Sequence, residues 1–158
     1  MRQRPRAPSV TPRRRAAAAG ERFSRYLGVL ASLDPDEMHH AACDRIVSAG
    51  GHRVYVHALA ETFSILTGGR QGRRSSAATA TRLIEQSVLA YVQAHTLTGK
   101  DMLAALAECE SRGVRGGAIY DWLHLAAARK AGAEVFFTLD LRDFQSLVRR
   151  GDPRIEVP

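Results

Sequence analysis

The sequence predicts an α/β protein with three layers, in which helices cover both faces of a mostly parallel central sheet. Short runs of β-branched and aromatic residues, which favour strands, alternate along the chain with longer helical segments. Parallel strands need a crossover of about a dozen residues between them, so this alternation favours a parallel sheet. The 158 residues are 45% hydrophobic and 25% charged, a composition typical of a single globular domain.

The charge of the chain is concentrated at its start. Residues 1–20 contain six arginines and no acid, and we expect them to form a disordered basic leader before a single domain at 21–158. The rest of the chain is close to neutral, so the high isoelectric point does not by itself indicate nucleic-acid binding. No apolar stretch approaches the ~20 residues that span a bilayer, which excludes membrane insertion. The expected compartment is a bacterial cytoplasm, where Cys43 and Cys109 stay reduced.

The first half of the domain contains one ambiguous segment and one marked helix start. Residues 25–33 are apolar but too few for periodicity to separate a strand from a helix. Asp34, Pro35 and Glu37 stand where a helix cap, a first helical residue and a capping-box acid belong, which predicts a helix from Asp34 to about Ser48. The elements expected next are a strand at 53–56, a helix at 57–67, a polar loop at 72–76 and a helix at 77–89.

The second half repeats the same alternation. Residues 91–97 alternate as a strand does, and Thr98 with Asp101 forms a capping-box pattern that predicts a helix to about Ser111. A basic, glycine-rich connector follows at 112–117. The last expected elements are a helix at 118–130 capped by Gly132, a strand at 134–139, a short helix at 140–149 and an edge strand at 155–157.

Three carboxylates are predicted to meet at one edge of this sheet, because ligands bind beyond the carboxyl ends of parallel strands. Glu61 lies in the second turn of the helix after the 53–56 strand, and Asp140 directly follows a strand. Asp121 lies near the start of the helix before the 134–139 strand, and because that helix runs antiparallel to the strand, its amino end also lies at the carboxyl edge. Each acid also has a simpler interpretation. Glu61 could pair with a distant arginine, Asp121 could complement the helix dipole, and Asp140 could cap the last helix.

Acids that converge in this way indicate a metal site. Carboxylates about 4–6 Å apart repel one another by several kcal/mol, so they take up protons or hold a cation. Oxygen ligands favour Mg²⁺ or Mn²⁺ over zinc. A metal that activates water and neutralises phosphate charge suits phosphodiester hydrolysis.

Three segments of the chain resemble the PIN-domain ribonucleases, and especially the VapC-type toxins of bacterial toxin–antitoxin pairs. They are VHALAETF at 56–63, GAIYDWLHLA at 117–126 and TLDLRDF at 138–144. The resemblance implies an α/β/α sandwich, Mg²⁺-dependent cleavage of RNA, a homodimer, and inhibition by a small antitoxin protein. It also implies that Glu61, Asp121 and Asp140 are the catalytic and metal-binding acids, that Asp143 is a further metal ligand, and that Thr138 is a polar helper.

The chain departs from the family at its first motif, an apolar strand that ends in an aspartate. No acid occurs between Glu21 and Asp34, so we expect the first strand to be degenerate or absent and the metal site to be short of one acid. One interpretation is a degenerate relative that binds antitoxin or RNA without cleaving it. The other is that residues 1–28 come from a shifted or wrongly assigned start, which the other two reading frames of the gene would reveal.

Other basic and aromatic residues have weaker interpretations. His57 and His124 lie one turn from the acids, and we interpret them as substrate-contacting or packing residues rather than as bases. The loop arginines Arg73, Arg74, Arg112 and Arg115 are candidates for holding RNA phosphates, with ordinary solvated charge as the alternative. A DNA-binding protein is a third functional class, but no recognition helix is evident.

Overall fold

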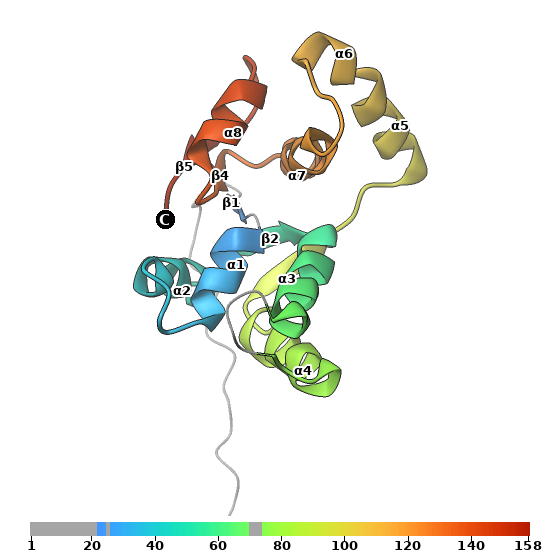
Figure 1. Ribbon diagram of the computed structural model, residues 1–158. Coiled ribbons are helices and arrows are strands. Elements are labelled where there is room, and N and C mark those ends of the chain that lie inside the picture. The colour runs from blue at the N-terminus through green and yellow to red at the C-terminus, as the bar shows by residue number, and fades with distance from the viewer. Residues whose placement is uncertain (1–21, 25, 70–73) are drawn as a thin grey trace, which may run out of the picture.

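The computed structural model describes residues 22–24, 26–69 and 74–158, so the expected leader at 1–20 lies outside the described residues (Figure 1). Within these ranges five strands form one sheet in the order β3-β2-β1-β4-β5, and every pairing is parallel. The elements are β1 (Arg22–Ser24), α1 (Tyr26–Leu33), α2 (His40–Ser48), β2 (His52–Tyr55), α3 (His57–Gly68), α4 (Ala77–Ser87), β3 (Val92–His95), α5 (Gly99–Ala107), α6 (Cys109–Arg112), α7 (Ala118–Lys130), β4 (Val135–Phe137), α8 (Leu141–Leu147) and β5 (Arg154–Glu156).

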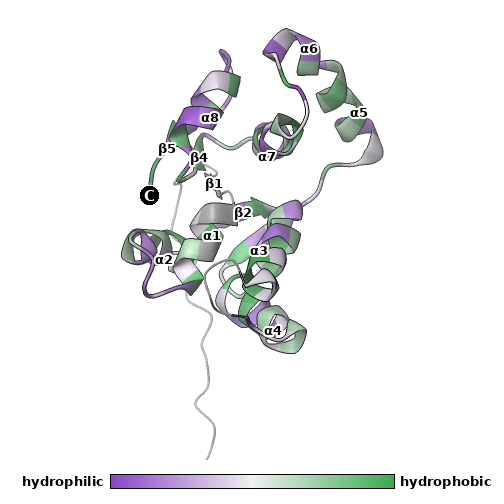
Figure 2. Cartoon of the chain, viewed as in Figure 1, coloured by the Kyte–Doolittle hydropathy of each residue, from purple (hydrophilic) through white to green (hydrophobic). Residues whose placement is uncertain are grey.

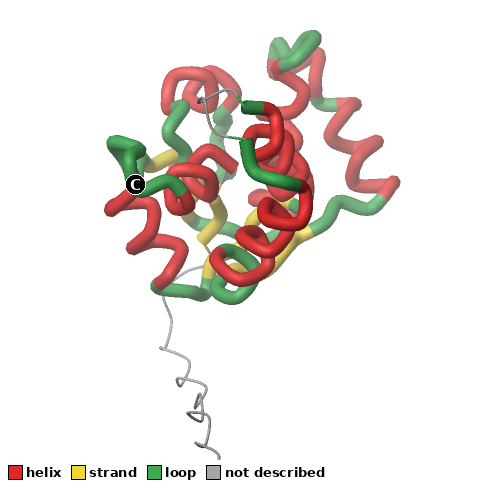
Figure 3. Tube along the Cα trace, turned by 60° about the horizontal axis from the view of Figure 1, so that its bottom comes forward, coloured by secondary structure: helices red, strands yellow, loops and turns green. Residues whose placement is uncertain are grey.

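The predicted three-layer α/β/α architecture is confirmed. In Figure 1 the sheet lies between α1 to α4 on one side and α5 to α8 on the other, and Figure 3 shows the short strands among the helices. Neighbouring residues of β2 serve opposite faces: Val54 packs in a cluster with Val29 and Val47, and Tyr55 packs with Trp122 and Phe136. The strand β4, whose three residues are all hydrophobic and buried, lies between the two layers (Figure 2).

The first strand is present, short and central. β1 has three residues and pairs with β2 on one side and β4 on the other. Of the two expected alternatives, a degenerate first strand is confirmed and a missing first strand is wrong. Phe23 is fully buried and stacks on Phe136 with ring centroids 6.1 Å apart. This one side chain anchors the middle of the sheet, although the strand ends at Ser24 without a carboxylate.

The predicted helix start at Asp34 is wrong. The backbone N–H of Asp36 donates to Asp34 Oδ1 at 3.1 Å, which closes a turn, and α2 begins only at His40. Aspartate side chains compete for backbone donors in this way, so the same residue type that caps helices also makes turns. The ambiguous apolar segment before it is helical and forms α1.

The helix boundaries downstream agree closely with prediction, with two corrections. The helix at 118–130 is exact, but its C-cap is Ala131, and Gly132 follows with φ 71°. The segment expected as one helix to Ser111 is divided into α5 and α6 at Glu108. Among the described helices, none is long and apolar enough to cross a membrane.

The capping box of α5 predicts a pH dependence of stability. Hydrogen bonds from Thr98 and Lys130 lower the pKa of Asp101 to about 2. An acid whose pKa is lowered by folding stabilises the protein above its unfolded pKa, and this stabilisation disappears as the pH falls through the folded value. We therefore expect Asp101→Asn to destabilise the protein at neutral pH, and most of the difference from the native chain to disappear as the pH falls from about 4 to about 2. Urea unfolding across this range measures it, with the exposed Glu110→Gln as control, and a difference that is undiminished at pH 2 would contradict the assignment.

Candidate functional site

Glu61 lies where the sequence predicts, at the carboxyl edge of the sheet. The helix α3 that carries it starts two residues after the end of β2. The side chain is 21% exposed, and His124 of α7 donates its Nε2–H to Glu61 Oε2 at 2.8 Å. His57 Nε2 lies 4.0 Å from the other carboxylate oxygen. The partner of Glu61 is thus a buried histidine from the opposite layer, rather than the distant arginine considered above.

Asp121 shares this edge with Glu61. It is half-buried in the first turn of α7, one turn before His124. The neighbouring Tyr120 stacks on His57 with ring centroids 5.4 Å apart and planes 6° from parallel. These two contacts, His124 with Glu61 and Tyr120 with His57, hold the first two turns of α3 and α7 side by side.

Thr138 and Asp140 form the turn that leaves β4. Thr138 is fully buried, and its Oγ1 accepts the backbone N–H of Asp140 at 3.0 Å. Asp140 is the N-cap residue of α8, but its side chain makes no capping hydrogen bond, so the capping interpretation of this acid is not what the structure shows. Asp143 is exposed on α8. The hydroxyl of Thr138 therefore orders the backbone at Asp140, and the roles assigned to these three residues at a metal remain predictions.

The acids offer the right atoms for Mg²⁺ or Mn²⁺, but the described residues do not form a complete site. Carboxylate oxygens are the ligands that these hard cations prefer. Within residues 22–24, 26–69 and 74–158, no group of three or more His, Cys, Asp or Glu side chains is arranged to hold a metal ion. Glu61 already accepts a hydrogen bond from His124, and β1 contributes no acid at its end. The carboxylates are therefore the right type of ligand for Mg²⁺ or Mn²⁺, but too few of them are arranged together among the described residues.

The interpretation of Arg112 as a phosphate-binding loop residue is wrong. Its side chain is 7% exposed and pairs with Asp152 through Nη1 and Oδ2 at 2.6 Å. The same nitrogen donates to the carbonyl of Leu147 at 2.9 Å, and Glu108 lies one turn away at 3.1 Å. Arg112 is the centre of a structural ion-pair network that connects α6 to the end of the chain.

The other loop arginines differ in position. Arg115 is exposed in the loop that leads into α7, and Arg74 is exposed before α4. Arg73 lies outside the described residues. Arg115 therefore stays a candidate phosphate-binding residue, five positions before Tyr120 in the sequence.

Sequence reasoning did not foresee the ring contacts around Glu61. Tyr55 and His124 meet edge to face with ring centroids 5.5 Å apart, and His57 and Tyr120 stack outside them. A signal was present, since positions 57 and 61 of α3 and positions 120 and 124 of α7 each lie one helical turn apart and share a face. This spacing identifies neighbours within each helix, but it does not predict that the side chains of α3 pair with those of α7 across the two layers.

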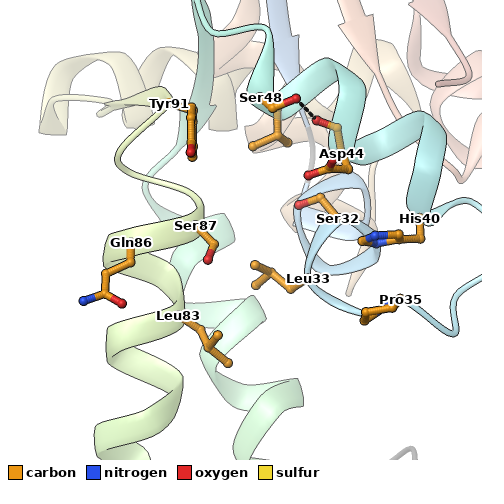
Figure 4. Close-up of a pocket in the computed structure, with 11 residues that line it drawn as sticks. Ser32, Leu33, Pro35, His40, Asp44, Ser48, Leu83, Gln86, Ser87 and Tyr91 are labelled. Atoms are coloured by element: carbon orange, nitrogen blue, oxygen red, sulfur yellow. Dashed lines mark hydrogen bonds between the residues drawn. The ribbon is translucent and has the colours of Figure 1, made fainter. Parts of the chain in front are cut away.

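A separate pocket of about 280 Å³ lies at the opposite edge of the sheet (Figure 4). Its walls come from α1, α2 and α4, with Ser48 at the end of α2 and Tyr91 just before β3 marking the amino ends of the strands. Ser48 Oγ donates to the carbonyl of Asp44 at 2.6 Å. None of the predicted site acids lines this pocket, so the candidate site is distinct from it.

Comparison with known proteins identifies the fold. No family model matches the chain, and no curated protein matches it in sequence. VapC20 of Mycobacterium tuberculosis, a sarcin–ricin-loop-cleaving toxin, is similar in structure with a TM-score of 0.62 and 21% identity, over 84% of this chain and 100% of the toxin chain. DNA-bound VapBC of Salmonella typhimurium has a TM-score of 0.60 and 17% identity, over 88% and 98%. VapBC2 of Rickettsia felis, bound to a DNA fragment from its promoter, has a TM-score of 0.57 and 12% identity, over 87% and 98%. The chain therefore has the PIN-like α/β/α fold of the VapC toxins.

Proposed function

We propose that the chain is the toxin of a VapC-type toxin–antitoxin pair and that it hydrolyses RNA phosphodiesters in a bacterial cytoplasm. One observation carries this proposal: Glu61 of α3 and His124 of α7 are in direct contact at the carboxyl edge of the sheet. That contact joins two of the three sequence motifs that resemble PIN-domain ribonucleases. The similarity in fold to a toxin that cleaves the sarcin–ricin loop supports RNA as the substrate class.

Glu61, Asp121 and Asp140 are the acids that would hold Mg²⁺ or Mn²⁺, with Asp143 as a further ligand. When bound, such an ion would supply an activated water and neutralise phosphate charge. His124 fixes the orientation of Glu61 through the 2.8 Å hydrogen bond. Thr138 fixes the turn at Asp140 through its buried hydroxyl.

The proposed partners follow from the same similarity. Two of the similar structures are VapBC complexes bound to DNA, which supports an antitoxin as the protein partner of this chain. A homodimer is the proposed assembly, and size-exclusion chromatography with light scattering measures it directly.

A second function is favoured by a specific observation: no acid ends the central strand, and the described residues contain no group arranged to hold a metal. A chain short of one metal ligand could keep its RNA-binding and antitoxin-binding surfaces and lose cleavage. In that case the protein binds RNA or antitoxin as a catalytically degenerate relative.

A cleavage assay separates the two functions. We expect the native chain to cut RNA with Mg²⁺ or Mn²⁺ and not with EDTA. Asp121→Asn is expected to reduce the rate by about 100-fold or more, since even groups that only orient metal ligands are worth 10–100-fold. Asp44→Asn is the control, because it removes the same charge from an exposed site at the opposite edge.

Intact RNA with both the native chain and Asp121→Asn, while a cognate antitoxin still binds, would reject cleavage and establish the second function. Equal cleavage by the native chain, Asp121→Asn and Asp44→Asn would instead reject this edge of the sheet as the active site.

A further inference from the structure

Four rings form a continuous cluster at the carboxyl edge, built from β2, α3 and α7: Tyr55, His57, Tyr120 and His124. The inner pair, Tyr55 and His124, is buried, with 6% and 0% exposure, and meets edge to face. The ring centroid of His57 lies 6.2 Å from Tyr55 and 6.1 Å from His124. The outer ring, Tyr120, stacks on His57. The ring cluster therefore runs from the core to the surface, and each ring supports the next.

The two outer rings of this cluster are exposed. Tyr120 is 52% exposed, and the side chain of His57 is 39% exposed. His57 lies parallel to Tyr120 on one side of its ring, and Tyr120 keeps enough exposed area for a further stacking contact. An exposed tyrosine alone implies nothing, and Tyr91 is 48% exposed elsewhere on the surface. Tyr120 differs because its ring is held in a fixed plane by a partner that the core supports.

A flat, exposed and immobilised ring pair is suited to stacking an unpaired nucleobase. Proteins bind single-stranded nucleic acid by stacking successive bases on aromatic side chains, and this contact tolerates any base because every base has a π-face. A base within a duplex is already stacked on both sides and is not available to such a surface. The position is also appropriate, since His57 lies 4.0 Å from Glu61 and Tyr120 adjoins Asp121.

One exposed basic side chain precedes this ring pair in the chain, since Arg115 lies in the loop that leads into α7.

We propose that His57 and Tyr120 form a stacking platform that holds one unpaired base of a single-stranded RNA beside Glu61 and Asp121. The choice of RNA as the ligand rests on the proposed function. The platform defines the substrate class more narrowly, as RNA in which the nucleotide at the site is unpaired.

The test uses the full chain, EDTA to prevent cleavage, and a short single-stranded RNA with one 2-aminopurine, whose fluorescence falls when it stacks. We expect the protein to quench this fluorescence and to bind a duplex of the same sequence more weakly. Tyr120→Ala is expected to weaken binding by about 5- to 150-fold, the range for loss of one base–aromatic stack. The same variant is expected to remove the quenching. Tyr120→Phe keeps the ring and is expected to bind as the native chain does, and Tyr91→Ala is the control for loss of an exposed tyrosine.

Unchanged affinity and quenching in Tyr120→Ala would overturn the platform and favour a protein partner as the ligand of the ring pair. Equal losses of affinity in Tyr120→Phe and Tyr120→Ala would also overturn it, because the effect would then belong to the tyrosine hydroxyl. Circular dichroism of each variant confirms that it is folded. Because binding is measured without metal, a protein that quenches but never cleaves supports the platform and contradicts only the hydrolysis. If the Tyr120→Ala variant cleaves RNA at the native rate, only the platform is contradicted.

Discussion

Replacing Arg112 with alanine is expected to lower the free energy of unfolding by about 3–5 kcal/mol, the usual cost of removing one partner of a buried ion pair. The side chain of Asp152 is 2% exposed, and Arg112 reaches both of its oxygens, at 2.6 and 3.3 Å. Without the guanidinium, the partners that this buried carboxylate keeps among the described residues are Arg129, whose Nη1 lies 3.7 Å away, and the backbone N–H of Arg149 at 2.8 Å. The penalty arises from the charge that is left behind rather than from the strength of the pair itself.

Arg112 also makes contacts that an exposed arginine lacks. Its guanidinium carbon lies 3.9 Å from the ring centroid of the fully buried Trp122, and Nη1 donates to the carbonyl of Leu147. Loss of this cation–π contact and of a buried hydrogen bond adds to the destabilisation.

Urea unfolding followed by circular dichroism measures the effect, with Arg82→Ala on the exposed surface of α4 as control. The double variant Arg112→Met, Asp152→Leu is expected to recover much of the loss, because it removes both buried charges together. Equal stability of Arg112→Ala and Arg82→Ala would show that the ion-pair network contributes nothing.

The elements that the sequence predicted best are those set by local chemistry. The α7 helix begins and ends at the expected residues because an unbroken run of helix-forming residues lies between glycines, and the capping box of Thr98 and Asp101 is a contact within four residues. The helix start at Asp34 failed for the same local reason, because an aspartate can close a turn as readily as it caps a helix.

Contacts between distant segments could not be predicted in this way. The partners of Arg112 lie 35 and 40 positions along the chain, so its surroundings in the sequence suggested a solvated loop. At the candidate site, the rule for parallel sheets correctly placed Glu61 and Asp121 at one edge, because it depends only on the order of strands and helices. The hydrogen bond between Glu61 and His124 depends on side-chain packing across 63 positions, about which spacing carries no information.

Returning a carboxylate to the end of the central strand is the change expected to raise activity most. Ser24 ends β1 and is in register with Val54 of β2 and Phe137 of β4. Glu61 follows β2 in the chain and Asp140 follows β4, so an acid at the end of β1 comes between the elements that carry the other two. Ser24→Asp is therefore expected to increase Mg²⁺-dependent RNA cleavage by about tenfold or more, in line with the 10–100-fold effects of groups that support a metal site.

The same variant should also reveal the metal through stability. Without Mg²⁺ an added acid near other carboxylates destabilises the protein through like-charge repulsion, and with Mg²⁺ at 100 times its Kd the folded state gains about 2.7 kcal/mol. The melting temperature of Ser24→Asp should thus rise with Mg²⁺ by more than that of Ser24→Asn, which keeps the native acids but lacks the added charge. Arg25, which follows in the sequence and lies outside the described residues, is replaced in parallel as Arg25→Asp. If both aspartate variants fold and neither gains cleavage or stabilisation by Mg²⁺, a missing acid at the end of the first strand is not what limits cleavage. The added carboxylate would then have met no other metal ligands at this edge of the sheet.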